Sequence, residues 1–277
     1  MSTLSNLSNL QQRVIAAFVG GIGILYAIYA NQWSFFAMFL FIGINCQIEF
    51  YRLVSNELAK PNMFLGLFIG ILNLVFTFCY MQSWLEARWF LLNLPLVSLI
   101  FLQELYRKKE NPFANISFTL IGIIYTSVPF SLMVASAFVK GKGDYSYQIV
   151  MGCLLMLWAS DSGAYFAGKN LGRRKLFERI SPKKTWEGSI GGLLSSLLFA
   201  FVLSFWFTDL ELWKWLVLAV IIVVIGSYGD LVESLFKRSI EIKDSGSFIP
   251  GHGGFLDRFD GLLLAVPFIT TFLFFFQ

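Results

Sequence analysis

Acidic side chains gather between residues 158 and 260 of this chain, at the ends of apolar segments where charged groups are costly. Two pairs stand three residues apart, Asp230 with Glu233 and Asp257 with Asp260, so each pair shares one face of a helix. Asp161 lies at the end of another apolar segment. Carboxylates gathered at one membrane depth repel each other unless a cation lies among them. The pattern therefore predicts a site that holds positive charge.

Two kinds of cation could balance these acids. Mg²⁺ takes oxygen ligands and commonly bridges one or two carboxylates to the phosphates of a substrate, which would make the cluster a catalytic metal site. Alternatively, the acids form structural ion pairs with Lys237, Arg238 and Arg258. Ionisable groups in membrane segments usually serve a pathway or a site, so we expect the metal.

A strongly basic segment follows Asp161. It holds seven Lys and Arg and a single acid, Glu178, between Lys169 and Lys184. Basic residues are enriched in cytoplasmic loops and attract anionic lipid heads, which explains such a segment without any catalysis. Beside a carboxylate cluster, the same segment could instead clamp a polyphosphate through residues such as Lys183.

A glycine-rich loop, Pro250–Gly254, leads into the helix expected to begin near Asp257. Glycine permits the tight turns of such a loop, and backbone N–H groups beside a helix N-terminus attract phosphate. His252, within the loop, is the only histidine of the chain, too few for a zinc site. We expect it to contact phosphate or to act as a general acid or base; simple packing within the loop is the alternative.

The elements that position these residues are predicted to be membrane helices. Hydrophobic residues make up 57% of the 277 residues and charged residues 14%, and the mean hydropathy is +0.68. Such a chain has too little polar surface to cover a water-facing globule, so lipid must be its solvent. We expect an all-α, polytopic membrane bundle of about nine spans, each of roughly 20 residues. The predicted spans are 14–30, 33–51, 62–81, 89–105, 113–138, 147–168, 186–207, 212–234 and 258–276.

The distribution of basic residues predicts how the bundle lies in the membrane. Alternate connections hold 17 of the 21 Lys and Arg, and the other set holds only Arg88, Lys140, Lys142 and Lys214. Because basic loops favour the cytoplasm, we expect the N-terminus inside, the C-terminus outside and the polar cluster on the cytoplasmic side. Residues 1–145 are expected to form a scaffold, with lipid access and dimer contacts, and residues 146–277 a catalytic region. Cys46, Cys79 and Cys153 lie in apolar runs and are expected to be buried hydrophobes.

Three polar segments resemble one known family. The segment 234–260 closely resembles the hallmark segment of the phosphatidate cytidylyltransferases, or CDP-diacylglycerol synthases, and the segments 160–165 and 181–188 also look like that family. The match covers sharply spaced polar positions from 158 to 261, whereas the first 145 residues resemble the family only in hydropathy.

The resemblance implies an all-helical, homodimeric membrane enzyme that joins CTP to phosphatidic acid and releases pyrophosphate. It implies Mg²⁺ as cofactor and leaves a second cation open. It places Asp230, Asp257 and Asp260 at the metal centre with Asp161 beside them. The residues then expected to bind substrate are Ser160, Lys183, Lys184, Lys237, Arg238, Lys243, Gly253, Gly254 and Arg258. No nucleic acid is expected as a partner.

Two other functions stay open from the sequence. One is a CTP-dependent kinase of lipid alcohols, of the dolichol or phytol type, which also uses a membrane carboxylate site. The other is a transporter of an anionic solute, which would suit intramembrane acids and glycine-interrupted helices, although the halves show no inverted repeat. The chain lacks the phosphate-loop, dinucleotide and zinc-protease motifs of soluble enzymes. Its short N-terminus favours a bacterial inner membrane.

Overall fold

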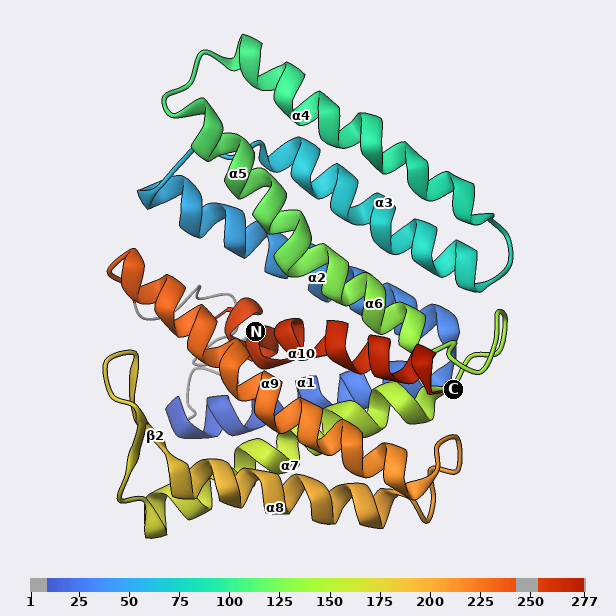
Figure 1. Ribbon diagram of the computed structural model, residues 1–277, viewed down its shortest axis with the longest axis vertical. Helices are drawn as coiled ribbons and strands as arrows, with labels where there is room; N and C mark the ends of the chain where they lie inside the picture. Colours follow the sequence, from blue (N-terminus) through green and yellow to red (C-terminus); the bar gives the residue numbers. More distant parts are fainter. Residues whose placement is uncertain (1–8, 243–253, 277) are drawn as a thin grey trace.

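Apolar runs of roughly 20 residues form the long helices of the computed structural model, which describes residues 9–242 and 254–276, and side chains in 18–55, 58–242 and 254–276. The helices run side by side as a bundle (Figure 1). In chain order they are α1 (Asn9–Ala30), α2 (Gln32–Glu57), α3 (Met63–Met81), the 3₁₀ turn η1 (Ala87–Leu92), α4 (Asn93–Arg107), α5 (Pro112–Gly122), the π-helical η2 (Ile123–Ser127), α6 (Val128–Ser136), α7 (Tyr147–Leu171), α8 (Trp186–Leu203), α9 (Leu212–Ser239) and α10 (Leu256–Phe275).

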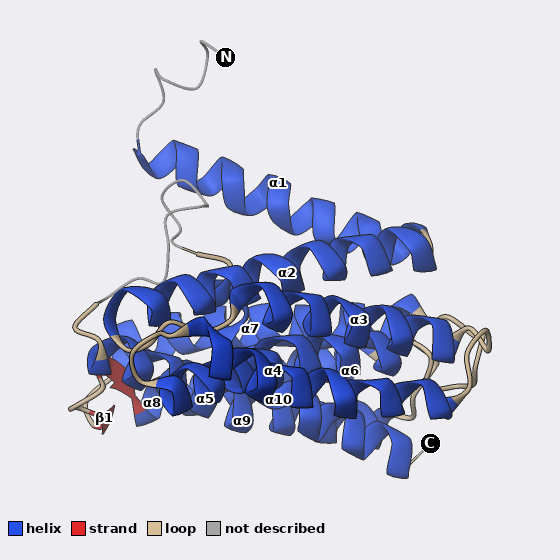
Figure 2. Ribbon diagram, turned by 90° about the horizontal axis from the view of Figure 1, so that it is seen from above, coloured by secondary structure: helices blue, strands red, loops and turns tan. Residues whose placement is uncertain are grey.

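The predicted all-α membrane bundle is confirmed. Within the described residues, eight helical segments are long and apolar enough to cross a membrane. They correspond to the second to ninth predicted spans. The first predicted span lies within α1. The side chains of α1 are described from Phe18 onward, and Phe18–Ala30 forms a shorter apolar stretch. Figure 2 shows α1 at the edge of the bundle, beside α2.

Large apolar side chains cover the outer faces of the helices. Phe64, Leu105 and Leu194, for example, are 76%, 76% and 62% exposed. Such faces would be unfavourable in water. In contact with lipid they are not, because lipid tails are as apolar as these side chains. The molecule is therefore an integral membrane protein.

A short β-hairpin interrupts the all-helical pattern and was not predicted. Strands β1 (Lys175–Phe177) and β2 (Ser181–Thr185) pair antiparallel between α7 and α8. At the base of the hairpin, the Trp186 N–H donates to the Arg174 carbonyl oxygen at 3.0 Å. The Glu187 carboxylate accepts hydrogen bonds from the backbone N–H groups of Arg173 and Arg174. These bonds give a regular structure to part of the basic segment between α7 and α8. From its charge alone, this segment was expected only to connect two helices.

The two sets of connections lie at opposite ends of the bundle, as the predicted spans require. At one end, Lys140 between α6 and α7 pairs with Asp209 between α8 and α9. At the other, the Lys60 N–H donates to Asn115 Oδ1 at 2.6 Å, joining the α2–α3 connection to α5. Figures 1 and 2 both place the hairpin and the C-terminal end of α10 at opposite ends. The basic connections therefore share one end of the molecule.

The packing joins both halves of the chain. One buried apolar cluster includes Phe39 and Phe130 from the first half and Trp215 and Leu262 from the second. The Thr270 and Ser136 hydroxyls lie 2.9 Å apart between α10 and α6. The division at residue 145 into a scaffold and a catalytic region stays a prediction, because packing alone does not separate the two roles.

Candidate active site

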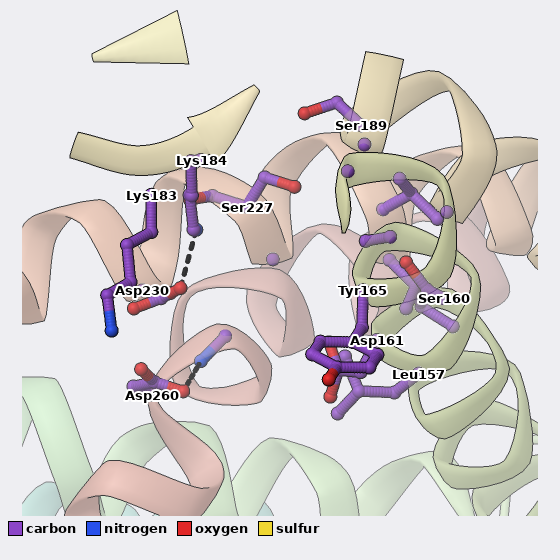
Figure 3. A pocket seen from close by; sticks show the side chains of 18 of the residues that line it. Leu157, Ser160, Asp161, Tyr165, Lys183, Lys184, Ser189, Ser227, Asp230 and Asp260 are labelled. Atoms are coloured by element: carbon purple, nitrogen blue, oxygen red, sulfur yellow. Dashed lines mark hydrogen bonds and ion pairs between the residues drawn. The ribbon is translucent and has the colours of Figure 1, made fainter. Parts of the chain in front are cut away.

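A cavity of about 410 Å³ opens between α7, α8, α9 and α10, beside the hairpin. Most of the polar residues singled out from the sequence line it: Ser160, Asp161, Lys183, Lys184, Asp230, Asp257, Arg258 and Asp260. In Figure 3, Asp161 lies on one side of this cavity, Asp230 and Asp260 lie on the other, and the two lysines extend from the hairpin. The fold thus brings together residues from four separate segments of sequence.

The wall formed by α9 holds Asp230. Its Oδ2 lies 2.5 Å from Lys184 Nζ, which comes from β2. The same Nζ donates to the backbone carbonyl oxygen of Ser227 at 3.1 Å. Lys184 therefore joins the hairpin to α9 and places a positive charge against the acid that faces the cavity.

The start of α10 holds Asp257 between two partners. Its Oδ1 accepts from Lys237 Nζ at 2.7 Å, and its Oδ2 accepts from the Gly254 N–H at 3.0 Å. Lys237 also lies 3.3 Å from Glu233 Oε2. Since the side chains of Glu233 and Asp257 are only 1% and 8% exposed, Lys237 is the cation that balances two buried acids.

Asp260 lies one turn further along α10, next to Asp230 (Figure 3). A very close contact of the two backbones sets this arrangement. A Cβ atom added at Gly229 of α9 would lie 2.7 Å from the Asp260 carbonyl oxygen and 2.9 Å from the Gly261 Cα. Only glycine fits such a contact, because it has no side chain. The two acids are neighbours because α9 and α10 touch here.

The opposite wall is α7, which presents Asp161 toward the cavity (Figure 3). Here too, small residues allow two helices to meet. A Cβ at Gly163 would lie 2.8 Å from the Gly191 carbonyl oxygen, and one at Gly191 would lie 2.2 Å from the Ala167 Cβ. Helices of membrane proteins often pack through small residues spaced in this way. The contact fixes Asp161 relative to α8 and to the hairpin that precedes it.

The hairpin presents Lys183 and Lys184 because its end continues directly into α8. Thr185 ends β2 and caps α8, since its Oγ1 accepts from the Gly188 N–H at 3.1 Å. Thr185 is buried, whereas Lys183 is exposed. The cap thus fixes the end of β2 at the start of α8, and Lys183 and Lys184, which precede it, line the cavity.

Some predicted residues take other positions. Lys237 does not line the cavity, because it lies beneath Asp257 in the ion pairs described above. Arg238 is exposed and donates to the Ile242 carbonyl oxygen at 3.4 Å. Gly254 contributes its N–H to Asp257 rather than to the cavity wall. For these residues, as for the rest of the predicted site, a role in binding substrate stays a prediction.

Three predicted site residues lie outside the described residues: Lys243, His252 and Gly253. The glycine-rich loop that contains the last two is described only from Gly254 onward. The predicted phosphate contact or acid–base role of His252 therefore stays a prediction.

The donors of the cavity suit a hard cation such as Mg²⁺. Asp161, Asp230 and Asp260 face one space, and Asp257 lines it while its two carboxylate oxygens accept from Lys237 and from the Gly254 N–H. Over the residues that the structure describes, no three His, Cys, Asp or Glu side chains form a ready-made metal cage. Mg²⁺ commonly needs only one or two carboxylates, the rest of its shell being water and substrate phosphate. The residues present therefore fit a magnesium ion that binds together with a phosphate substrate.

Sequence reasoning missed Glu49. This acid lies within α2, is 7% exposed, and accepts a hydrogen bond from the Leu256 N–H at the start of α10. A signal existed, since Glu49 is an acid within the apolar span 33–51. Tyr165 and Ser189, which also line the cavity, were missed as well.

Comparison with known proteins gives consistent results over nearly the whole chain. The model of a family described as the cytidylyltransferase family matches residues 11–276. A Haemophilus influenzae protein named phosphatidate cytidylyltransferase is 35% identical over an alignment that covers 96% of this chain and 99% of the relative. A Bacillus subtilis protein of the same name is 30% identical, with 94% and 96% covered. One from Staphylococcus haemolyticus is 40% identical over 60% of this chain and 62% of its own length.

Proposed function

Since this chain belongs to the cytidylyltransferase family, we propose that it transfers the cytidylyl group of CTP to phosphatidic acid, forming CDP-diacylglycerol and pyrophosphate. Membership confirms the resemblance predicted from the motifs between 158 and 261, and with it the expectation of an enzyme. One observation carries the proposed reaction: the acids and lysines of those motifs line a single open cavity. We place the reaction at the first committed step of CDP-diacylglycerol-dependent phospholipid synthesis.

The reaction joins two anions, and this defines what the site must do. A phosphate oxygen of phosphatidic acid attacks the α-phosphorus of CTP. A new P–O bond forms, the bond to the bridging oxygen breaks, and pyrophosphate leaves with the electron pair. The attacking oxygen is already ionised at neutral pH, so no protein nucleophile is needed. Catalysis then rests on neutralising charge and on positioning.

Mg²⁺ is the cofactor that we assign to this site. Asp230 and Asp260, which lie side by side, would hold it, with Asp257 and Asp161 close to the same space. When bound, such an ion neutralises phosphate oxygens and orients the attack. Whether a second cation takes part stays open.

The cations of the chain itself would hold the two polyanions. Lys183, Lys184 and Arg258 all line the cavity, and the lysines enter it from the hairpin side. Charged donors bind phosphate oxygens more strongly than neutral donors do. The ion pair with Asp230 holds the Lys184 ammonium group in position. A phosphate that binds beside this pair would therefore meet a positive charge that is already in place.

The apolar part of the cavity suits the lipid substrate. Leu157, Ile222 and Val223 line it together with glycines of α8, α9 and α10. These residues lie along the helices rather than in the connections, so that wall extends into the membrane-spanning part of the bundle. We infer that the head group of phosphatidic acid reaches the acids while its acyl chains stay in lipid.

The proposed location is the bacterial inner membrane, with the site facing the cytoplasm, the N-terminus inside and the C-terminus outside. Two observations support it: the relatives are bacterial, and the basic connections share the end of the bundle that holds the cavity. A homodimer, implied by the family resemblance, stays a prediction.

A direct assay tests the reaction. The purified full-length protein is incubated with phosphatidic acid and with CTP labelled at the α-phosphate or at the γ-phosphate. Cytidylyl transfer places the α-label in the lipid, whereas a lipid kinase would transfer the γ-label. Uptake of solute into sealed vesicles without any turnover of CTP would favour a transporter. Label in the lipid only from the γ-phosphate, or none at all, would refute the proposal.

Two substitutions test the assigned acids. Asp230→Asn and Asp257→Asn are expected to abolish the Mg²⁺-dependent reaction in protein that still folds, and removal of Mg²⁺ by a chelator should have the same effect on the unaltered chain. Asp144→Asn is the control, since Asp144 is an exposed acid in the connection between α6 and α7 at the other end of the bundle. Substantial activity in either site variant would remove the metal role from that residue.

A further inference from the structure

Glu49 is a buried acid that lies far in sequence from the candidate site and contacts the helix that carries two of its acids. It lies within α2, is 7% exposed, and its Oε2 accepts a hydrogen bond from the Leu256 N–H at 2.9 Å. Leu256 is the first residue of α10, the helix that carries Asp257 and Asp260. An acid in a membrane span is costly enough that a specific role is the default expectation.

The start of α10 needs such a partner. The first N–H groups of any helix have no partner inside the helix, and in a buried setting each one left unpaired is unfavourable. Phe255 at the N-cap position offers no side-chain acceptor, and no side-chain cap from α10 itself is present among the described residues. Glu49 supplies the acceptor from α2, and a carboxylate at a helix N-terminus is also favoured by the helix dipole.

The region around Glu49 fixes the position of α10 in addition to supplying an acceptor for its first N–H group. Phe255 packs edge-to-face against Phe41 of α2, with ring centroids 5.8 Å apart. Asp257, two residues after Phe255, is held from the other side by Lys237 of α9. The first turn of α10 is therefore pinned between α2 and α9, one turn before Asp260.

We propose that Glu49 is a positioning residue: its carboxylate caps α10 at Leu256 and so fixes Asp257 and Asp260 relative to the acids of α7 and α9. This role rests on the function proposed above, because it is defined by the reaction that those acids serve. Glu49 does not line the cavity, so it acts through α10 and not on the substrate. The N-terminal half of the chain thereby contributes to the geometry of the site.

A series of substitutions of similar shape separates capping from bulk and from charge. Glu49→Gln keeps an acceptor oxygen at the same reach and loses the charge. Glu49→Met keeps the volume and loses the acceptor. Glu49→Asp keeps the charge and withdraws the carboxylate by one methylene, so it also tests the proposal if the Met variant does not fold. Glu104→Met is the control, since Glu104 is a buried acid of α4 that contacts Arg107 and Asn115, away from the cavity.

Each variant is purified at full length, and kcat, KM for CTP and the melting temperature are measured on folded protein. Capping predicts that the Gln variant keeps kcat within about 3-fold, while the Met and Asp variants lose about 10- to 100-fold in kcat with little change in KM, as expected for misplaced catalytic groups. The Glu104→Met control should lower the melting temperature and leave the kcat of the folded protein unchanged. Unaltered kcat in the folded Met and Asp variants would overturn the proposal, and so would a Gln variant as inactive as the Met variant.

Hydrogen exchange gives a readout that does not depend on the reaction. The amides of residues 254–260 are followed by mass spectrometry in the unaltered protein and in the same variants. Faster exchange in the Met and Asp variants, but not in the Gln or Glu104→Met variants, is expected. Equal exchange in all of them would refute the capping role. If the unaltered protein transfers no cytidylyl group yet shows this exchange pattern, the proposed reaction fails while the capping contact stands.

Discussion

The contact between α9 and α10 at Gly229 offers the sharpest test of how the site is positioned. In Gly229→Ala, the new Cβ would lie 2.7 Å from the Asp260 carbonyl oxygen, and a backbone atom cannot rotate away as a side chain can. Opening this contact to 3.4 Å, the near limit of ordinary contact, requires the two helices to separate by about 0.7 Å. The displacement falls between Asp230 and Asp260, the two acids assigned to the metal.

The expected magnitude follows from this displacement. Overpacking a tight contact usually costs about 1–3 kcal/mol of stability, partly offset by roughly 0.5–1 kcal/mol gained when alanine replaces glycine in a helix. Misplacing catalytic groups by about 1 Å can cost on the order of 100-fold in rate. We therefore expect Gly229→Ala to lower kcat by roughly 10- to 100-fold while the melting temperature falls only modestly.

A neighbouring glycine provides the matched control. Gly226 lies on α9 one turn earlier, and a Cβ there would approach no atom of α10 closer than 3.6 Å. Gly226→Ala should therefore keep or slightly raise the melting temperature. Gly23→Ala in α1, where nothing lies within 4 Å of the added carbon, controls for activity. The assay measures label transferred from the α-phosphate of CTP to lipid, together with thermal unfolding. If Gly229→Ala kept kcat within twofold of the unaltered chain, the backbone contact would not be what positions the acids.

Three further substitutions test the other contacts of the site. Lys184→Gln removes the cation beside Asp230 and should lower kcat/KM by roughly 100-fold, the usual scale for a donor that stabilises developing charge, with an unchanged kcat/KM arguing against it. Lys237→Met removes the cation that the structure describes between Glu233 and Asp257. It should lower the free energy of unfolding by about 3–5 kcal/mol, measured by thermal or denaturant unfolding; a stability equal to that of the unaltered chain would contradict the ion-pair assignment. Gly191→Ala should separate α7 from α8 and destabilise the protein by about 1–3 kcal/mol, whereas a melting temperature equal to that of Gly23→Ala would show that the contact can relax.

Composition and hydropathy were enough to predict the class of fold. Lipid is a uniform solvent, so a run of about 20 apolar residues has few alternatives to a membrane helix. The alternation of basic and neutral connections likewise predicted which helix ends lie together, and the contact of Lys60 with Asn115 agrees with it. The hairpin, in contrast, depends on local hydrogen bonds. The number of charged residues in a segment does not predict such bonds.

The acids show how much the spacing of residues on a helix can predict about which side chains face the cavity. Residues three apart on a helix differ in direction by about 60°, which is enough to separate two roles. Asp230 faces the cavity and pairs with Lys184, whereas Glu233 is buried and pairs with Lys237. The prediction that the two acids share a face therefore does not make both of them part of the cavity wall. Asp257 and Asp260 do both line it.

Long-range contacts were beyond the sequence analysis for a physical reason. The partner of Glu49 is a backbone N–H, and every residue except proline has one, so no residue type marks it. Gly229 looks the same in sequence as Gly23, although one touches another helix and the other touches nothing. Only the packed structure distinguishes a glycine that permits a contact from one that does not.

Of the two interpretations of the acid cluster, the structure shows ion pairs, and the metal site stays a prediction that these pairs leave room for. Lys237 pairs with the buried Glu233 and with Asp257 at the cavity wall, and Lys184 pairs with Asp230, which faces the cavity. Carboxylates left unbalanced in a membrane protein would favour protonation or distortion of the helices. Internal cations therefore allow the cluster to exist before any ligand arrives, while the remaining carboxylate oxygens stay directed at the open cavity. The divalent cation proposed for this site stays a prediction; if it binds, it would in turn favour the entry of phosphate.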